Sequence, residues 1–192
     1  SKKIKSSLFK KKLYEKNDLI FGQCRLVTDG PRYVSEFNQP LIFKNLIGTH
    51  NGIATDYLKD SFSENLSSKN DSLQIYKDIE KLPDQNQKSI REFLNTKNGI
   101  LNLVFYDLSK KILNIYTNNG SLYYIKNQNL FLLGSEKYFL EKLGELLNIK
   151  VSISKFELNE IYSFDPESFK LIKNFDNKKI NLQSNYTHKI YD

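Results

Sequence analysis

The stretch GILNLVFYDLSKKILNIYTNNGSLYYIKNQNLFLLGS, residues 99–135, decides the fold class of this 192-residue chain. Four apolar runs rich in β-branched and aromatic residues cover 100–108, 111–118, 121–126 and 129–135, and the polar sequences SKK, NNG and NQN separate them. Runs of this length between Asn, Gly and Lys turns are typical of an antiparallel β-meander. The sequence therefore predicts four strands in this region.

Helices are expected on both sides of the meander. Residues 71–82 place leucine, isoleucine and tyrosine near one face, with Asp71 suitable as an N-cap and Pro83 as the stop. Further helices are expected over 89–97 and 136–147. After them, the chain alternates apolar and polar residues like a last hairpin or pair of strands. This order indicates an α+β fold of two antiparallel sheets with segregated helices.

The first third of the chain adds a basic lead-in and two β-rich runs. Residues 6–16 have the spacing of a short amphipathic helix, and 19–29 read as a strand that ends at the turn signal Gly30-Pro31. Residues 45–57 form a second such run, with a glycine on each side of Thr49-His50-Asn51. Glycines there permit a close backbone approach or a positive φ.

Composition limits the class of protein. The chain is 39% hydrophobic and contains no apolar run of about 18 residues, and its lysine-rich start is not followed by an apolar stretch. Cys24 is the single cysteine and His50 and His188 are the two histidines, so a disulfide framework or a metal centre is not expected. We expect a soluble, cytoplasmic protein without a cofactor, with a basic lead-in over 1–19, one domain over 20–180, and a polar tail or linker to a further domain over 181–192.

The net charge of +7 is concentrated at one end. Residues 1–16 carry seven lysines against one glutamate, so the remainder is nearly neutral, and three arginines accompany 26 lysines. Such a lysine excess reflects AT-rich coding better than a phosphate-binding surface. Nucleic acid is therefore not the expected partner.

Several short motifs follow one another between residues 22 and 53. In order, they are Gly22, Arg25, Thr28 with Gly30, Asn38-Gln39-Pro40, and His50-Asn51-Gly52-Ile53. Their order and spacing resemble the glutamine amidotransferase domain of the class II, N-terminal-nucleophile type, the family of asparagine synthetase and glucosamine-6-phosphate synthase. The sequence SKNDSLQIYKDI, residues 68–79, is similar to that family's segment that opens a helix with an aspartate, here Asp71.

The resemblance spans residues 20–175 and implies a four-layer α-β-β-α fold, incomplete at its N-terminus. It implies that Arg25 binds the α-carboxylate of glutamine and Asp71 the α-ammonium, with Thr28 adding a hydroxyl. It further implies that the Asn51 amide and the Gly52 N–H form an oxyanion hole. The Arg25-Leu26 pair is closest to the asparagine synthetases.

The family's N-terminal cysteine nucleophile is missing from this sequence, which begins at Ser1. Cys24 is no substitute, because strand alternation turns it away from the face of Arg25. Three explanations remain open: the nucleophile segment lies outside this sequence or on another chain, the domain is degenerate and keeps only the glutamine pocket, or Ser1 itself is the nucleophile.

Ordinary structural roles compete with these assignments. Asn51-Gly52 is also a hairpin-turn dipeptide, and Asp71 is also a helix N-cap. Arg25 is also suited to pairing with a structural carboxylate, and His50 is better explained as a packed strand residue than as a general base.

Taken together, the sequence predicts the glutamine-binding part of an amidotransferase. It would hydrolyse glutamine to glutamate and ammonia for a synthetase domain or subunit, with the nucleophile supplied from outside, for example by a separate N-terminal fragment. The alternative is a non-catalytic amidotransferase-like domain that binds glutamine or scaffolds a partner.

Overall fold

The computed structural model describes residues 19–20, 22–23, 38–57, 70–126, 130–149, 152–168 and 170–172. Nine strands and three helices are assigned within these ranges: β1 Leu41–Ile42, β2 Leu46–Ala54, α2 Asp71–Lys81, α3 Gln87–Asn95, β3 Gly99–Asp107, β4 Ile112–Thr117, β5 Tyr123–Lys126, β6 Phe131–Gly134, α4 Lys137–Leu146, β7 Ile153–Lys155, β8 Glu160–Phe164 and β9 Leu171–Ile172.

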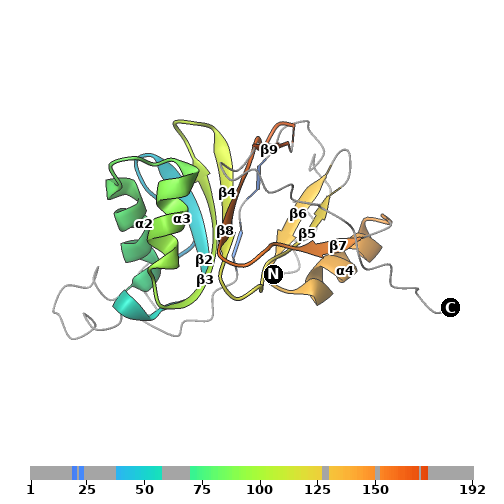
Figure 1. The fold of residues 1–192 in the computed structure, drawn as a ribbon. Helices are drawn as coiled ribbons and strands as arrows, with labels where there is room; N and C mark the ends of the chain where they lie inside the picture. The colour runs from blue at the N-terminus through green and yellow to red at the C-terminus, as the bar shows by residue number, and fades with distance from the viewer. Residues whose placement is uncertain are drawn as a thin grey trace.

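The larger sheet has six antiparallel strands in the order β1-β2-β3-β4-β8-β9. Its longest pairing joins β2 to β3, with Asn51 opposite Asn102 and Gly52 opposite Leu101. In Figure 1, α2 and α3 cover one face of this sheet and the smaller sheet lies beyond the other face. The smaller sheet has the order β6-β5-β7, and α4 lies beside it.

Side chains alternate along each strand of the larger sheet, so one set points toward α2 and α3 and the other toward the smaller sheet. On the helix-facing side, Leu101, Leu103 and Phe105 of β3 join a buried cluster that also contains Ile75 and Tyr76 of α2. The apolar positions of α2 fall on one side of the helix, so burying them against the sheet accounts for its stability. This cluster fixes α2 directly over β2.

Gly48 of β2 allows this close contact. A side chain there would lie 2.4 Å from the ring of Tyr76, which is completely buried. The Tyr76 hydroxyl instead donates to the Thr49 carbonyl at 2.6 Å. The glycine therefore lets Tyr76, in the middle of α2, pack closely against β2.

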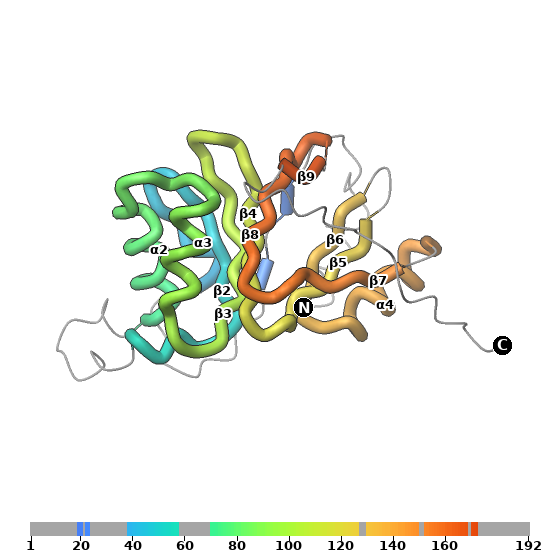
Figure 2. Tube along the Cα trace, in the orientation of Figure 1, coloured from blue at the N-terminus to red at the C-terminus, as the bar shows by residue number. Residues whose placement is uncertain are grey.

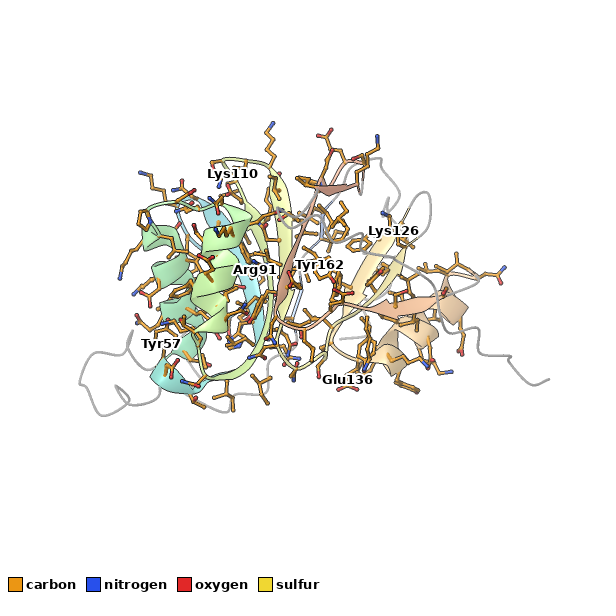
Figure 3. All side chains as sticks on the ribbon, in the orientation of Figure 1. Tyr57, Arg91, Lys110, Lys126, Glu136 and Tyr162 are labelled. Atoms are coloured by element: carbon orange, nitrogen blue, oxygen red, sulfur yellow. The ribbon has the colours of Figure 1, made fainter. Side chains whose placement is uncertain are left out.

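The opposite face of the larger sheet contributes to a second core. Ile115 and Tyr162 from this sheet pack in one cluster with Tyr124 of β5 and with Phe156. Figure 3 places Tyr162 between the two sheets. Aromatic contacts hold this layer together, since the Tyr124 and Phe156 rings lie 4.7 Å apart.

Most of the described strands occur where the sequence predicts them, β1 being an exception, but two pairs of predicted neighbours do not pair. The meander is broken after β4, because β4 pairs with β8 and β5 pairs with β6 and β7. The predicted final pair also separates, with β7 joining the smaller sheet and β8 the larger, where β8 forms a hairpin with β9. Figure 2 shows the chain crossing between the sheets after β4 and returning before β8. Turn signals mark where strands end but not which sheet the next strand joins.

Three local predictions need correction or lie outside the description. Asn70, not Asp71, caps α2, because its side chain accepts from the Leu73 N–H at 2.8 Å. The predicted strand over 19–29 is described only at 19–20 and 22–23, which are not in a strand. The expected helix over 6–16 lies outside the described residues.

The mixed α/β class with antiparallel sheets is confirmed. Among the described residues, no helix has the length and apolar character needed to cross a membrane.

Candidate functional site

The backbone of His50 in β2 is held by two glutamine side chains. Gln39 accepts from the His50 N–H at 2.5 Å and donates to the His50 carbonyl at 3.0 Å. Gln23 donates to the same carbonyl at 3.0 Å. The Gln39 amide thus satisfies both main-chain groups of His50 as a neighbouring strand would.

The imidazole of His50 points toward the helices and is 2% exposed. Its Nε2 lies 3.1 Å from the Ile100 carbonyl oxygen, and its Nδ1 lies 3.0 Å from the Ser72 hydroxyl. Burial lowers the pKa of His50, against the opposing effects of Asp71 and the Ile100 hydrogen bond. The buried ring, with both nitrogens engaged by the protein, has the surroundings of a packed strand residue, as the sequence indicated.

Asn51 and Gly52 lie inside β2, so the hairpin-turn interpretation of this dipeptide is wrong. Asn51 is exposed, and alternation turns its side chain to the face opposite His50. Its carbonyl accepts from the Asn102 side-chain amide at 2.8 Å. The Asn102 oxygen in turn accepts from the Thr117 hydroxyl at 2.6 Å. This buried polar row fixes the backbone of Asn51 across three strands.

Gly52 adopts a φ of 152°, which side-chain-bearing residues rarely adopt. A Cβ atom at this position would lie 1.9 Å from the Ile100 carbonyl oxygen and 3.0 Å from Nε2 of His50. Glycine is therefore required at this position of β2, beside the Ile100 carbonyl of β3.

Asp71 begins α2 beside this part of β2. Its Oδ2 accepts from the Ala54 N–H at 2.8 Å, and its Oδ1 accepts from the Ser72 N–H at 2.7 Å. Oδ2 also lies 3.8 Å from Nδ1 of His50. The side chain keeps 13% exposure, so a carboxylate held by two backbone donors remains accessible to a ligand. A carboxylate in this position can accept hydrogen bonds from an ammonium group.

The structure brings the segments of three predicted site residues together, although the Asn51 side chain lies on the sheet face opposite the one where Asp71 meets His50. The bond from Ala54 to Asp71 joins α2 to β2 two residues after Gly52, so Asp71, Asn51 and Gly52 belong to adjoining segments. Arg25 and Thr28, together with Cys24, lie outside the described residues. The described residues contain no group of three His, Cys, Asp or Glu side chains suited to a metal ion.

Sequence reasoning missed the residues that support this site. Gln23 and Ser72 lie next to motif residues, but nothing else in the sequence marks them as part of a site. Gln39 belongs to the Asn-Gln-Pro motif, but its contact with His50 depends on tertiary structure. Asn102 had a recognisable signal, since a polar amide in the apolar run over 100–108 needs a buried partner.

No family model matches the chain, and no curated protein matches it either. Several solved structures are similar to it, including these two. One is a glutamine phosphoribosylpyrophosphate (PRPP) amidotransferase from B. subtilis complexed with ADP and GMP, with a TM-score of 0.53 and 16% identity over 72% of this chain and 32% of that one. The other is described as the allosteric regulatory enzyme of purine biosynthesis, with the same TM-score and identity over 72% of this chain and 31% of that one.

At 16% identity this likeness shows the fold alone, and this chain matches about a third of the length of either structure. The likeness in fold agrees with the N-terminal-nucleophile-hydrolase-like fold that the motifs predicted. The likeness does not single out the asparagine synthetases.

Proposed function

We propose that this domain is the glutamine-binding part of a class II glutamine amidotransferase. Its main support is the Ala54–Asp71 hydrogen bond, which joins the predicted ammonium-binding carboxylate to the strand of the predicted oxyanion residues, in a fold similar to that of a glutamine PRPP amidotransferase. The proposal includes the finer four-layer arrangement, with α2 and α3 outside one sheet and α4 outside the other.

Each proposed contact binds one chemical group of glutamine. Arg25 binds the α-carboxylate through its guanidinium fork and Thr28 adds a hydroxyl. Asp71 accepts from the α-ammonium. The Asn51 amide and the Gly52 N–H stabilise the oxyanion formed when the side-chain amide is attacked. Selectivity for the free amino acid follows from requiring both charged groups at once.

In the proposed hydrolysis, the nucleophile is an N-terminal cysteine supplied from outside this sequence. The α-amino group of this cysteine takes the thiol proton, the thiolate adds to the amide carbon, and the proton passes to the amide nitrogen as ammonia leaves. A thioester remains, which water then cleaves to glutamate and the free thiol. The ammonia passes to a synthetase domain or subunit. A cytoplasmic setting belongs to the same proposal.

Binding and hydrolysis are tested separately. Calorimetric titration of the 192-residue chain with L-glutamine is expected to show binding, and Asp71→Asn and Arg25→Lys are each expected to lose roughly tenfold or more in affinity, about 1.4 kcal/mol. Asp84→Asn, a matched change on the loop before α3, is expected to bind as the unmodified chain does. Absence of glutamine binding would overturn the proposed function, whereas binding that neither variant weakens would overturn the site.

Ammonia release by the same sample distinguishes the two forms of the function. The intact mass of every polypeptide present is measured alongside it. Release that requires a second fragment beginning with cysteine supports the amidotransferase. Tight glutamine binding without release, even with that fragment added, would instead identify a non-catalytic glutamine-binding domain.

A further inference from the structure

The hydroxyl of Ser72 occupies the centre of the polar network beneath the proposed site. Ser72 is 5% exposed, and its Oγ lies 3.0 Å from Nδ1 of His50 and 3.2 Å from Oδ1 of Asp71. The side-chain amide of Gln39 donates to it at 3.3 Å. Helix α2, strand β2 and the segment before β1 therefore meet at one hydroxyl group.

The hydroxyl has one hydrogen, and His50 decides where it points. The Ile100 carbonyl can only accept, so Nε2 of His50 carries a hydrogen. In a neutral ring Nδ1 is then a bare acceptor, and the hydroxyl of Ser72 is the donor beside it. In a protonated ring Nδ1 becomes a donor, and the hydroxyl hydrogen is released toward Asp71.

These two orientations leave Asp71 in different states. When the hydroxyl points to His50, Oδ1 of Asp71 receives only the Ser72 N–H, at 2.7 Å, and keeps acceptor capacity for a ligand. When the hydroxyl points to Asp71, it occupies that capacity, and a cationic ring stands 3.8 Å from the carboxylate. Among the described residues, Asp71 is the charged group that acts on His50. The other groups around the ring are the Ile100 carbonyl and the Ser72 hydroxyl, while the amide of Gln39 holds the backbone of His50.

We propose that Ser72 and His50 are positioning residues that keep Asp71 open for the α-ammonium group of the ligand and close it when His50 is protonated. This inference rests on the proposed function for the identity of the ligand. It adds a determinant of specificity, because a ligand without the ammonium group is insensitive to the state of Asp71.

The decisive measurement compares L-glutamine with 4-carbamoylbutanoate, which is glutamine without its α-amino group. The ratio of their affinities for the chain is expected to fall roughly tenfold between pH 8 and pH 4.5, the size of one hydrogen bond to a charged group. The fall is expected to follow the NMR titration of His50. In Ser72→Ala the fall shrinks to about two- to threefold, because only the charge of His50 remains.

Two further variants test the hydroxyl. Ser72→Thr retains it and is expected to restore the full fall, even if Ser72→Ala proves too unstable to assay. Ser89→Ala makes the matched change in the first turn of α3 and is expected to behave as the unmodified chain. A ratio that stays constant to pH 4.5, or a full fall in folded Ser72→Ala, would overturn the inference.

A measurement without ligand separates this inference from the proposed function. At pH 7.5 the 15N resonance of Nδ1 in His50 is expected to be that of an unprotonated acceptor, and loss of the Ser72 hydroxyl should shift it. If this shift occurs but glutamine does not bind, the proposed function fails while the hydroxyl orientation stands. If the resonance is unchanged by Ser72→Ala, the positioning role is refuted whatever glutamine does.

Discussion

Replacement of Gly52 by alanine is expected to destabilise the fold severely. The new Cβ atom would lie 1.9 Å from the Ile100 carbonyl oxygen, which must move by about 1.5 Å to reach the 3.4 Å of ordinary contact. The obstacle is backbone rather than a flexible side chain, so β2 and β3 must separate where they pair.

The magnitude follows from two separate costs. An alanine at a φ of 152° stores roughly 1–3 kcal/mol of backbone strain. Displacing the Ile100 carbonyl also breaks its hydrogen bond with Nε2 of His50, a loss of about 1 kcal/mol, and disturbs the adjacent pairing. Together these costs give an expected loss of roughly 2–4 kcal/mol, a large part of the stability of an ordinary domain.

Urea unfolding followed by circular dichroism measures this loss. Gly22→Ala is the control, because a Cβ atom there meets no atom within 4 Å. It is expected to change the free energy of unfolding by less than about 0.5 kcal/mol. A loss below about 1 kcal/mol in Gly52→Ala would refute the required close approach of β2 and β3.

Three further predictions concern the surrounding network. Burial lowers the pKa of His50 below its unfolded value of 6.5, so the unfolded chain binds the extra proton first and the free energy of unfolding should fall as the pH drops below about 6.5. In His50→Gln, the urea midpoint should depend less on pH between pH 7 and pH 5. Gln39→Ala removes both side-chain bonds to the His50 backbone and should cost about 2 kcal/mol, with faster hydrogen exchange of the His50 amide as the specific readout. Thr117→Val leaves the Asn102 oxygen without its donor and should cost about 1–3 kcal/mol in urea unfolding, whereas Thr117→Ser, which keeps the hydroxyl, should cost less than 1 kcal/mol.

The secondary structure of the described residues was largely predictable because its determinants are local. The helix-spaced apolar residues before Pro83 gave α2 within one residue of its observed end. The turn sequences after β3 and β4 gave the ends of those strands. The pairing was not local: nothing in residues 112–126 states that β4 joins β8 while β5 joins a different sheet. In the folded chain, aromatic residues of both sheets fill one shared core.

The site shows the same division between local and tertiary signals. The motif order identified Asn51, Gly52 and Asp71, and the structure brings their segments together through the Ala54–Asp71 hydrogen bond. The assignment of Asp71 as the N-cap failed because Asn70, one residue earlier, makes the capping bond with its own side chain. Capping by Asn70 leaves the Asp71 carboxylate to reach across to β2.

A single carbonyl group connects the strand geometry to the polar network. The Ile100 oxygen both excludes a side chain at Gly52 and accepts from Nε2 of His50. Nδ1 of the same ring lies within hydrogen-bond distance of the Ser72 hydroxyl, and Ser72 directly follows Asp71 in the sequence. A shift of β3 relative to β2 would therefore change the Gly52 backbone, the hydrogen bonding of His50 and the surroundings of the Asp71 carboxylate at once. Because packed strands shift as units, the proposed ammonium site and the proposed oxyanion site should gain or lose their geometry together. Gly52→Ala and Ser72→Ala are accordingly expected to be non-additive in a double-mutant cycle, whereas Gly52→Ala and the distant Ser89→Ala should add.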